Sequence, residues 1–113
     1  MEKLTLKRTE RTLLLKYVGE ITLEITGELK HRLDAELADE TVKAVVVDLS
    51  GVSFMDSSGI GFLVSVNTRM RSSGRCFYLY QLSPAVEKTL GLVQLLSFFA
   101  ILKDECALAA VCG

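Results

Sequence analysis

Two hydroxyls and a carboxylate stand together in the middle of this chain, in the run Asp56-Ser57-Ser58-Gly59. The run follows an apolar segment and precedes apolar residues at helical spacing, so we predict that it forms the first turn of a helix. Such a turn offers unpaired backbone N–H donors and the positive end of the helix dipole. A phosphate on Ser57 would be held by those donors and would present about −1.5 to −2 charge to a docked protein. The turn can therefore act as a modification switch.

A simpler interpretation of the same turn needs no modification. Asp56 and Ser57 are both residue types that cap helices, and a cap contributes about 1 kcal/mol to stability. Residue types alone favour this capping interpretation over the switch.

Other chemistry finds little support in the residues. His31 is the single histidine, and no G-x-S-x-G run presents a nucleophilic serine, which argues against a hydrolase and more broadly against an enzyme. Gly59 and Gly61 form the one G-x-G, but Val64 stands where a dinucleotide-binding loop needs its third glycine. We expect these two glycines to let a helix start pack closely against its neighbours. No cofactor is expected.

Length and charge narrow the remaining classes. The chain has 113 residues, which predicts a single domain over 1–113. Its 13 basic and 14 acidic residues give a net charge of −1, so no basic surface is available to recruit nucleic acid or an anionic membrane.

Cysteine usage and hydropathy predict a cytoplasmic protein. Cys76, Cys106 and Cys112 are odd in number and form no C-x-x-C, so we expect no metal site and three buried thiols in a reducing compartment. Charges interrupt residues 1–8, which is unlike a secretory signal. The longest uncharged stretch, residues 89–102, falls short of the about 20 apolar residues that a membrane span needs.

The elements that position the Ser57 turn are predicted from periodicity. Apolar residues alternate over residues 4–25, which predicts an antiparallel meander that Gly27 ends. A helix is expected over 29–39, a central buried strand over 44–47, and the helix that carries the turn from about 57 to 73.

The remaining residues alternate between strand and helix. We predict a strand over 76–80, a helix that Ser83 caps with Pro84 at its first position, a short strand over 98–101, and a last helix over 104–111. The fold class is therefore α/β, a small mixed β-sheet with antiparallel N-terminal strands and parallel later strands, packed with about four helices.

The residues around the turn closely resemble the signature of STAS domains of the bacterial anti-sigma factor antagonist family, of the sporulation and general-stress type. The resemblance is carried by VVVDLSGVSFMDSSGIG at 45–61, with further agreement in TGEL at 26–29 and LSPAV at 82–86, and it spans roughly 12–111. It implies a small α/β fold and a protein–protein switch in transcription regulation.

The resemblance also implies partners and residue roles. The unphosphorylated antagonist would bind an anti-sigma factor serine kinase, phosphorylation of Ser57 would release it, and a PP2C-type phosphatase would reset it. Asp56 would orient the hydroxyl or the helix start, Ser58 would be a neighbouring cap, and Gly59 and Lys30 complete the expected phosphosite environment.

Phe62 and Val66 lie off the apolar stripe of the predicted helix and are candidate partner contacts, with simple core residues as the alternative. Lys30 stands where many family members carry an aspartate. It is expected either to pair with Asp56 or with a phosphate on Ser57, or to be a solvated helix residue. Residues 1–11 form a predicted extra strand before the first strand of the family, which could lengthen the sheet or provide an edge for a partner.

Two other functions stay open at this point. The domain could be a STAS module of a transporter or lipid-trafficking complex, or of a sensory scaffold, that docks partners without phosphorylation. It could also bind a nucleotide or another anion at the Ser57 turn.

Overall fold

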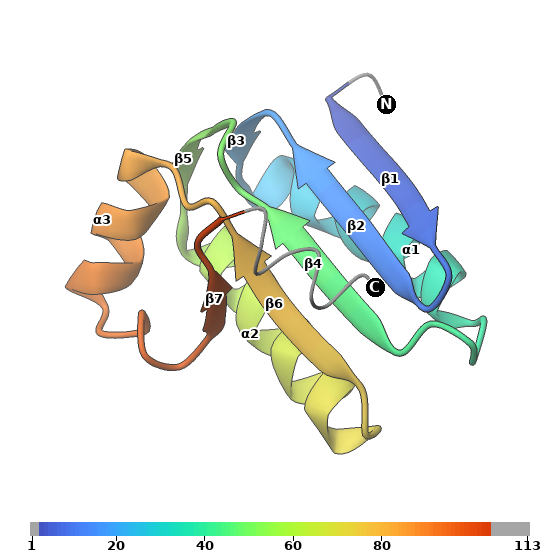
Figure 1. Ribbon diagram of the computed structural model, residues 1–113. Helices are drawn as coiled ribbons and strands as arrows, with labels where there is room; N and C mark the ends of the chain where they lie inside the picture. Colours follow the sequence, from blue (N-terminus) through green and yellow to red (C-terminus); the bar gives the residue numbers. More distant parts are fainter. Residues whose placement is uncertain (1–2, 105–113) are drawn as a thin grey trace.

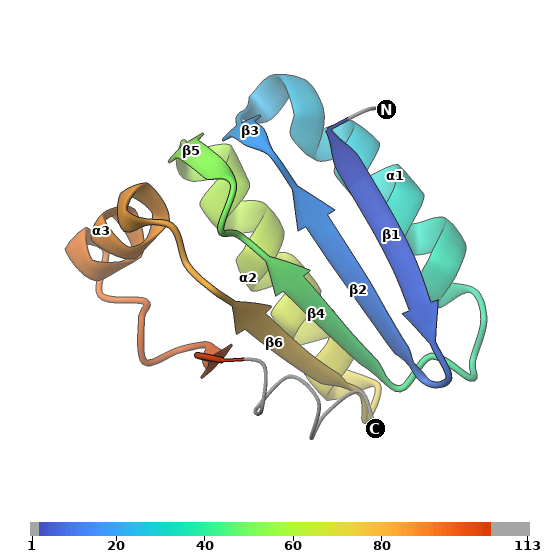
Figure 2. The same cartoon turned by 45° about the horizontal axis from the view of Figure 1, so that its top comes forward.

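The computed structural model describes residues 3–104, which form a sheet with α1 and α2 against one face and α3 beside one end (Figures 1 and 2). The strands are β1 (Leu4–Thr9), β2 (Thr12–Tyr17), β3 (Gly19–Ile21), β4 (Ala44–Asp48), β5 (Val52–Met55), β6 (Cys76–Tyr80) and β7 (Ala100–Leu102). The helices are α1 (Leu23–Leu37), α2 (Ser57–Ser72) and α3 (Pro84–Leu92).

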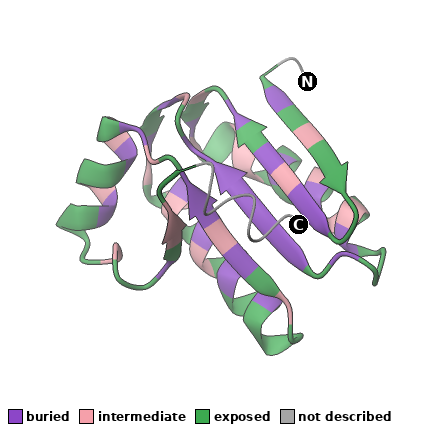
Figure 3. Cartoon of the chain, viewed as in Figure 1, coloured by how far each residue is buried: buried purple, intermediate pink, exposed green. Residues whose placement is uncertain are grey.

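The main sheet has the strand order β1-β2-β4-β6-β7. β1 and β2 are antiparallel, and the other neighbours are parallel, which confirms the mixed sheet. β4 is the middle strand and is buried at all five positions, as its continuous apolar run predicts. Buried residues concentrate along β2, β4 and β6 (Figure 3).

The prediction for the region after β2 is wrong. The antiparallel meander ends with β2, because β3 is only three residues long and pairs in parallel with β5 as a separate small sheet. Leu23 and Ile25 belong to α1, and Gly27 lies inside that helix instead of ending a strand. Apolar residues also recur every four positions from Ile25 through Leu29 to Leu33. This helical spacing, and not the alternation, matches the structure that forms.

The second half of the chain agrees more closely with its pattern. α2 runs from Ser57 to Ser72 as predicted. α3 has Pro84 at its start, and the Ser83 hydroxyl accepts a hydrogen bond from the Val86 N–H at 3.2 Å. No helix in residues 3–104 is long and apolar enough to cross a membrane.

Three details differ from the sequence-based expectation. The described residues hold three helices instead of about four, and the helix predicted over 104–111 lies outside them apart from its first residue. β7 begins at Ala100 instead of Phe98, and Phe99, just before it, is buried against Phe77. Cys76 is exposed instead of buried, whereas Cys106 and Cys112 lie outside the described range.

β1 lies at one edge of the sheet and is tied to the end of α1. Arg8 on β1 donates a hydrogen bond to Asp39 at 3.2 Å and lies 3.9 Å from the Glu36 carboxylate. Hydrogen bonds from the Thr41 hydroxyl and N–H lower the pKa of Asp39 to about 2. β1, Leu4–Thr9, is the strand predicted within residues 1–11. That this strand is an addition to the family pattern stays a prediction.

Candidate functional site

The first turns of α1 and α2 meet at a single carboxylate. Asp56 is the N-cap of α2, and its Oδ1 accepts a hydrogen bond from the Gly59 N–H at 3.0 Å. Its Oδ2 accepts from the N–H of Leu23, the first residue of α1, at 3.2 Å. The Asp56 N–H donates to the Ile21 carbonyl at 3.2 Å. Because the N-cap of α1, Thr22, makes no side-chain capping bond, Asp56 caps both helices.

Ser57 occupies the first position of α2 and is exposed. Among residues 3–104 its hydroxyl has no hydrogen-bond partner, and neither the Ser57 N–H nor the Ser58 N–H has one. Both amides belong to the first turn, where the helix itself supplies no acceptor. The turn therefore leaves a free hydroxyl beside two free N–H donors, as the sequence predicts.

Gly59 fixes how closely the two loops approach. A Cβ at this position would lie 2.6 Å from Met55 Cγ and 2.9 Å from the Ile21 carbonyl oxygen, so only glycine fits. This confirms the close packing expected of Gly59. The same expectation is wrong for Gly61, which is exposed and would have no neighbouring atom within 4 Å of a Cβ.

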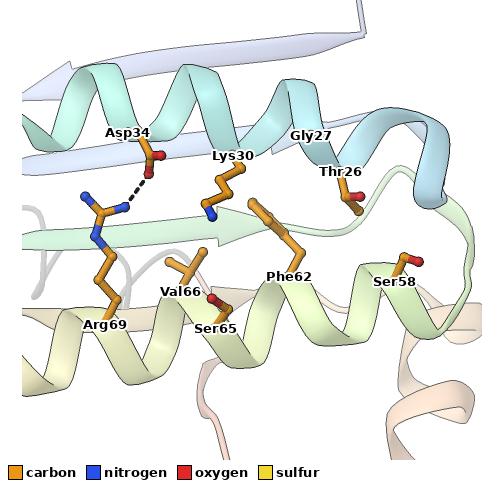
Figure 4. A pocket seen from close by; sticks show the side chains of 9 residues that line it. All are labelled: Thr26, Gly27, Lys30, Asp34, Ser58, Phe62, Ser65, Val66 and Arg69. Carbon is orange, nitrogen blue, oxygen red and sulfur yellow. Dashed lines mark hydrogen bonds and ion pairs between the residues drawn. The ribbon is translucent and has the colours of Figure 1, made fainter.

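A groove of about 540 Å³ runs between α1 and α2, beginning beside the Ser57 turn. Figure 4 shows the side chains of the two helices pointing toward one another across it, with the Arg69–Asp34 ion pair bridging the helices. The lining residues are Thr26, Gly27, Lys30 and Asp34 from α1, and Ser58, Phe62, Ser65, Val66 and Arg69 from α2. We call this the interhelical groove.

Lys30 is exposed on α1, and its side chain points into the interhelical groove (Figure 4). It does not pair with Asp56, whose carboxylate oxygens accept from two backbone N–H groups instead. Of the alternatives for this lysine, pairing with Asp56 is therefore wrong.

Phe62 and Val66 are not partly exposed as expected. They are 8% and 6% exposed, and they belong to the hydrophobic core. The stripe of α2 that faces the sheet is shifted from the expected one, so that Ile60 and Val64 are only half-buried. Phe62 and Val66 nevertheless line the interhelical groove, where their side chains are the apolar part of its surface.

Exposed apolar residues near the Ser57 turn were not identified from the sequence. Leu23 is 73% exposed beside the Asp56 carboxylate, and Phe54 is 48% exposed two residues before it. Leu23 is predicted within the alternating strands of residues 4–25, and Phe54 only as part of the apolar segment before the turn. Periodicity reports the average face of a segment, so it cannot show that these two side chains end on the surface.

Comparison with known proteins points to one family. The sequence pattern of the STAS domain matches residues 3–108. The anti-sigma F factor antagonist of Lysinibacillus sphaericus is 26% identical over 80 residues, which cover 71% of this chain and 68% of that protein.

Solved structures agree on the fold. The anti-sigma factor antagonist SpoIIAA in its unphosphorylated form superposes with a TM-score of 0.81 at 21% identity, covering 96% of this chain and 95% of that one. The Bacillus cell fate determinant SpoIIAA in its phosphorylated form superposes with a TM-score of 0.75 at 20% identity, covering 96% and 98%. Because the STAS domain pattern matches residues 3–108, almost the whole length of this chain, the chain belongs to the STAS domain family.

Proposed function

We propose that this protein is an anti-sigma factor antagonist that binds an anti-sigma factor serine kinase when unphosphorylated and is released when Ser57 is phosphorylated. The observation that carries the proposal is the exposed Ser57 hydroxyl, which has no partner among residues 3–104 and stands at the first position of α2. The Lysinibacillus sphaericus relative is named for antagonism of an anti-sigma factor, and SpoIIAA has a phosphorylated form, which supports the same function here.

The turn can hold a phosphate without unfolding. A phosphate on Ser57 would lie next to the free N–H groups of Ser57 and Ser58 and at the positive end of the α2 dipole. The Asp56 carboxylate is already engaged by Gly59 and Leu23, so its oxygens point to backbone donors. The modified helix start would therefore be locally stabilised. The protein would stay folded, and the added charge would change only how it binds a partner.

The surroundings of Ser57 explain how a phosphate would break a complex. Leu23, whose N–H bonds the Asp56 carboxylate, and Phe54, two residues before Asp56, are exposed apolar side chains that an apolar partner surface would cover. Such a partner would also remove water from Ser57. A dianion placed there would lose its hydration, which costs several kcal/mol where the partner surface offers it no cation.

The interhelical groove extends this surface along α2. We assign Phe62 and Val66 to its apolar floor as partner contacts, with the Lys30 side chain as the cation that points into it. Ser58 and Gly59 would act by shaping the turn. A PP2C-type phosphatase would reset the switch, and the antagonist itself would carry out no catalysis.

The proposal is tested by binding a candidate anti-sigma factor kinase to Ser57→Ala and Ser57→Asp in calorimetric titrations. We expect Ser57→Ala to bind like the native chain and Ser57→Asp to bind at least about a hundredfold more weakly, the equivalent of about 2.7 kcal/mol. Ser72→Asp is the matched control, because it adds the same charge to an exposed serine at the other end of α2. Equal affinities for the two Ser57 variants would sink the proposal.

A second measurement identifies the partner class. Phosphopeptide mapping of the protein from its native cells, with co-purifying proteins identified in the same sample, is expected to find phosphate on Ser57 and a kinase. An unmodified Ser57 together with a transporter or lipid-trafficking component would instead select a STAS module that docks without phosphorylation.

A further inference from the structure

A second cavity lies at the other end of α2, away from the Ser57 turn. It has a volume of about 350 Å³ and is formed by the C-terminal half of α2, by β6, and by the residues that lead into β7. This is within the size range of small-molecule sites. Among the described residues, none lines both this cavity and the interhelical groove. We call it the β6 pocket.

Asn67 is the unusual residue of the β6 pocket. It is 3% exposed on α2, and its amide Nδ2 has no hydrogen-bond partner among the residues that the structure describes. A buried amide without a partner costs about 1–3 kcal/mol, and its neighbours on the same face, Leu63 and Met70, are fully buried apolar residues. Protein atoms cover Nδ2 in this structure, so an oxygen of a bound molecule reaches it only when the wall of the pocket shifts; such a contact would explain a polar residue at this position.

The charged residues around Asn67 indicate the charge of a molecule that would bind there. Arg71 and Arg75 line the β6 pocket, and no aspartate or glutamate within residues 3–104 lines it. Arg75 donates through Nη1 to the Leu37 carbonyl at 3.2 Å, which fixes the guanidinium and leaves other N–H donors on it. Neither arginine forms an ion pair within residues 3–104. Two unpaired cations and a free amide favour an anion.

An aromatic side chain provides an apolar wall. Phe98 lines the pocket and is 39% exposed, although it is a large apolar residue. Its ring meets Phe99 edge to face with centroids 5.0 Å apart, and Phe99 is buried against Phe77 at 6.4 Å. The core therefore holds Phe98 in place with part of its ring uncovered, where a flat group can stack.

We propose that the β6 pocket binds a small organic anion in which a carboxylate or phosphate is attached to a flat ring. The anionic group contacts Arg71, Arg75 and the Asn67 amide, and the ring contacts Phe98. This site is separate from the Ser57 turn, and it stands whether or not Ser57 is phosphorylated.

The test is a titration of the full chain with phenyl phosphate, followed by the amide chemical shifts. We expect saturable shifts at residues 67, 71, 77, 78 and 98, and similar shifts with benzoate. Phenol and inorganic phosphate each lack half of the ligand, so we expect both to bind at least about tenfold more weakly. Arg71→Gln is expected to weaken phenyl phosphate about tenfold, and Asn67→Leu about threefold to tenfold.

Arg32→Gln is the matched control, because Arg32 lies on α1 and does not line the pocket. It should leave the affinity unchanged. Shifts that do not saturate, or that saturate equally in Arg71→Gln, would overturn the proposal and leave Asn67 to a bound water. Shifts confined to residues 57–61 would also overturn it, because the anion would then bind the helix start.

Discussion

The polar groups near the two ends of α2 differ in whether they are hydrogen-bonded. At the N-terminal end, the Asp56 carboxylate is fully engaged by two backbone N–H groups, and the exposed Ser57 hydroxyl is open to solvent. In the C-terminal half, the Asn67 amide is buried without a described partner. The first end is stable as it stands and offers a group for modification. The second lacks a hydrogen-bond acceptor for the Asn67 amide, which a bound molecule could provide.

The difference lies in how each end is assembled. The polar groups of the Ser57 turn belong to the adjacent residues 56–59, so they form a motif that can be recognised in the sequence. The β6 pocket combines α2, β6 and the segment before β7, and no short run of sequence contains it. A site that unites distant segments leaves no local signature, even where its residues are chemically informative.

The largest effect is expected from filling the space at the N-terminal end. Gly59→Ala would place a methyl group 2.6 Å from Met55 and 2.9 Å from Ile21, and should lower the free energy of unfolding by about 2–3 kcal/mol. Urea denaturation measures the change. Gly61→Ala is the control, because the position is open, and it should raise stability by up to about 1 kcal/mol. A neutral Gly59→Ala would contradict the tight approach of the two loops.

Removal of the shared cap should have the next largest effect. Asp56→Ala breaks the bonds to Gly59 and Leu23 together, so we expect a loss of about 2 kcal/mol in thermal or urea unfolding. Asp56→Asn keeps one acceptor oxygen but places an amide NH2 against the other backbone N–H, so it should lose at least about half as much. An Asp56→Asn variant as stable as the native chain would contradict the double cap.

Asn67→Leu should act in the opposite direction. Leucine replaces an unpartnered buried amide by an apolar side chain, so the free energy of unfolding should rise by about 1 kcal/mol in the absence of ligand. The comparison between the two ends would fail if the variant were clearly less stable than the native chain, since Asn67 would then have a partner such as bound water.

The smallest effect is a pH dependence that belongs to neither end. The pKa of Asp39 is lowered to about 2 from its model-compound value of 3.8, so its contribution to stability is complete above about pH 4 and is lost as the pH falls toward 2. Asp39→Asn should abolish that part of the acid sensitivity in unfolding curves recorded across this range. An unchanged acid response in Asp39→Asn would assign it to other carboxylates.

Much of the fold could be predicted, because several segments carry one dominant signal. The β-branched run of β4 and the Ser83-Pro84 start of α3 each have a single physical interpretation. The start of α1 does not, since Ile21, Leu23 and Ile25 alternate as in a strand, whereas Ile25, Leu29 and Leu33 recur at helical spacing. The contact that settles it is the bond from Leu23 to Asp56, which lies 33 residues away.

The candidate site was predictable to the same extent. Ser57, Asp56 and Gly59 follow from local residue types and from family resemblance. The burial of Phe62 and Val66 depends on how α2 rotates against the sheet, which side-chain type does not fix. The exposure of Leu23 and the pocket around Asn67 depend on tertiary packing alone.

The order of strands in the main sheet has a consequence for how the chain folds. β1 and β2 are joined by a two-residue turn and can pair within microseconds as a local hairpin. Each parallel neighbour that follows must wait for a connecting helix, because β2 meets β4 across α1 and β4 meets β6 across α2. These distant pairings close long loops and should set the refolding rate. The Ser57 turn lies within the second crossover, so it should acquire its final shape only when the centre of the sheet is complete.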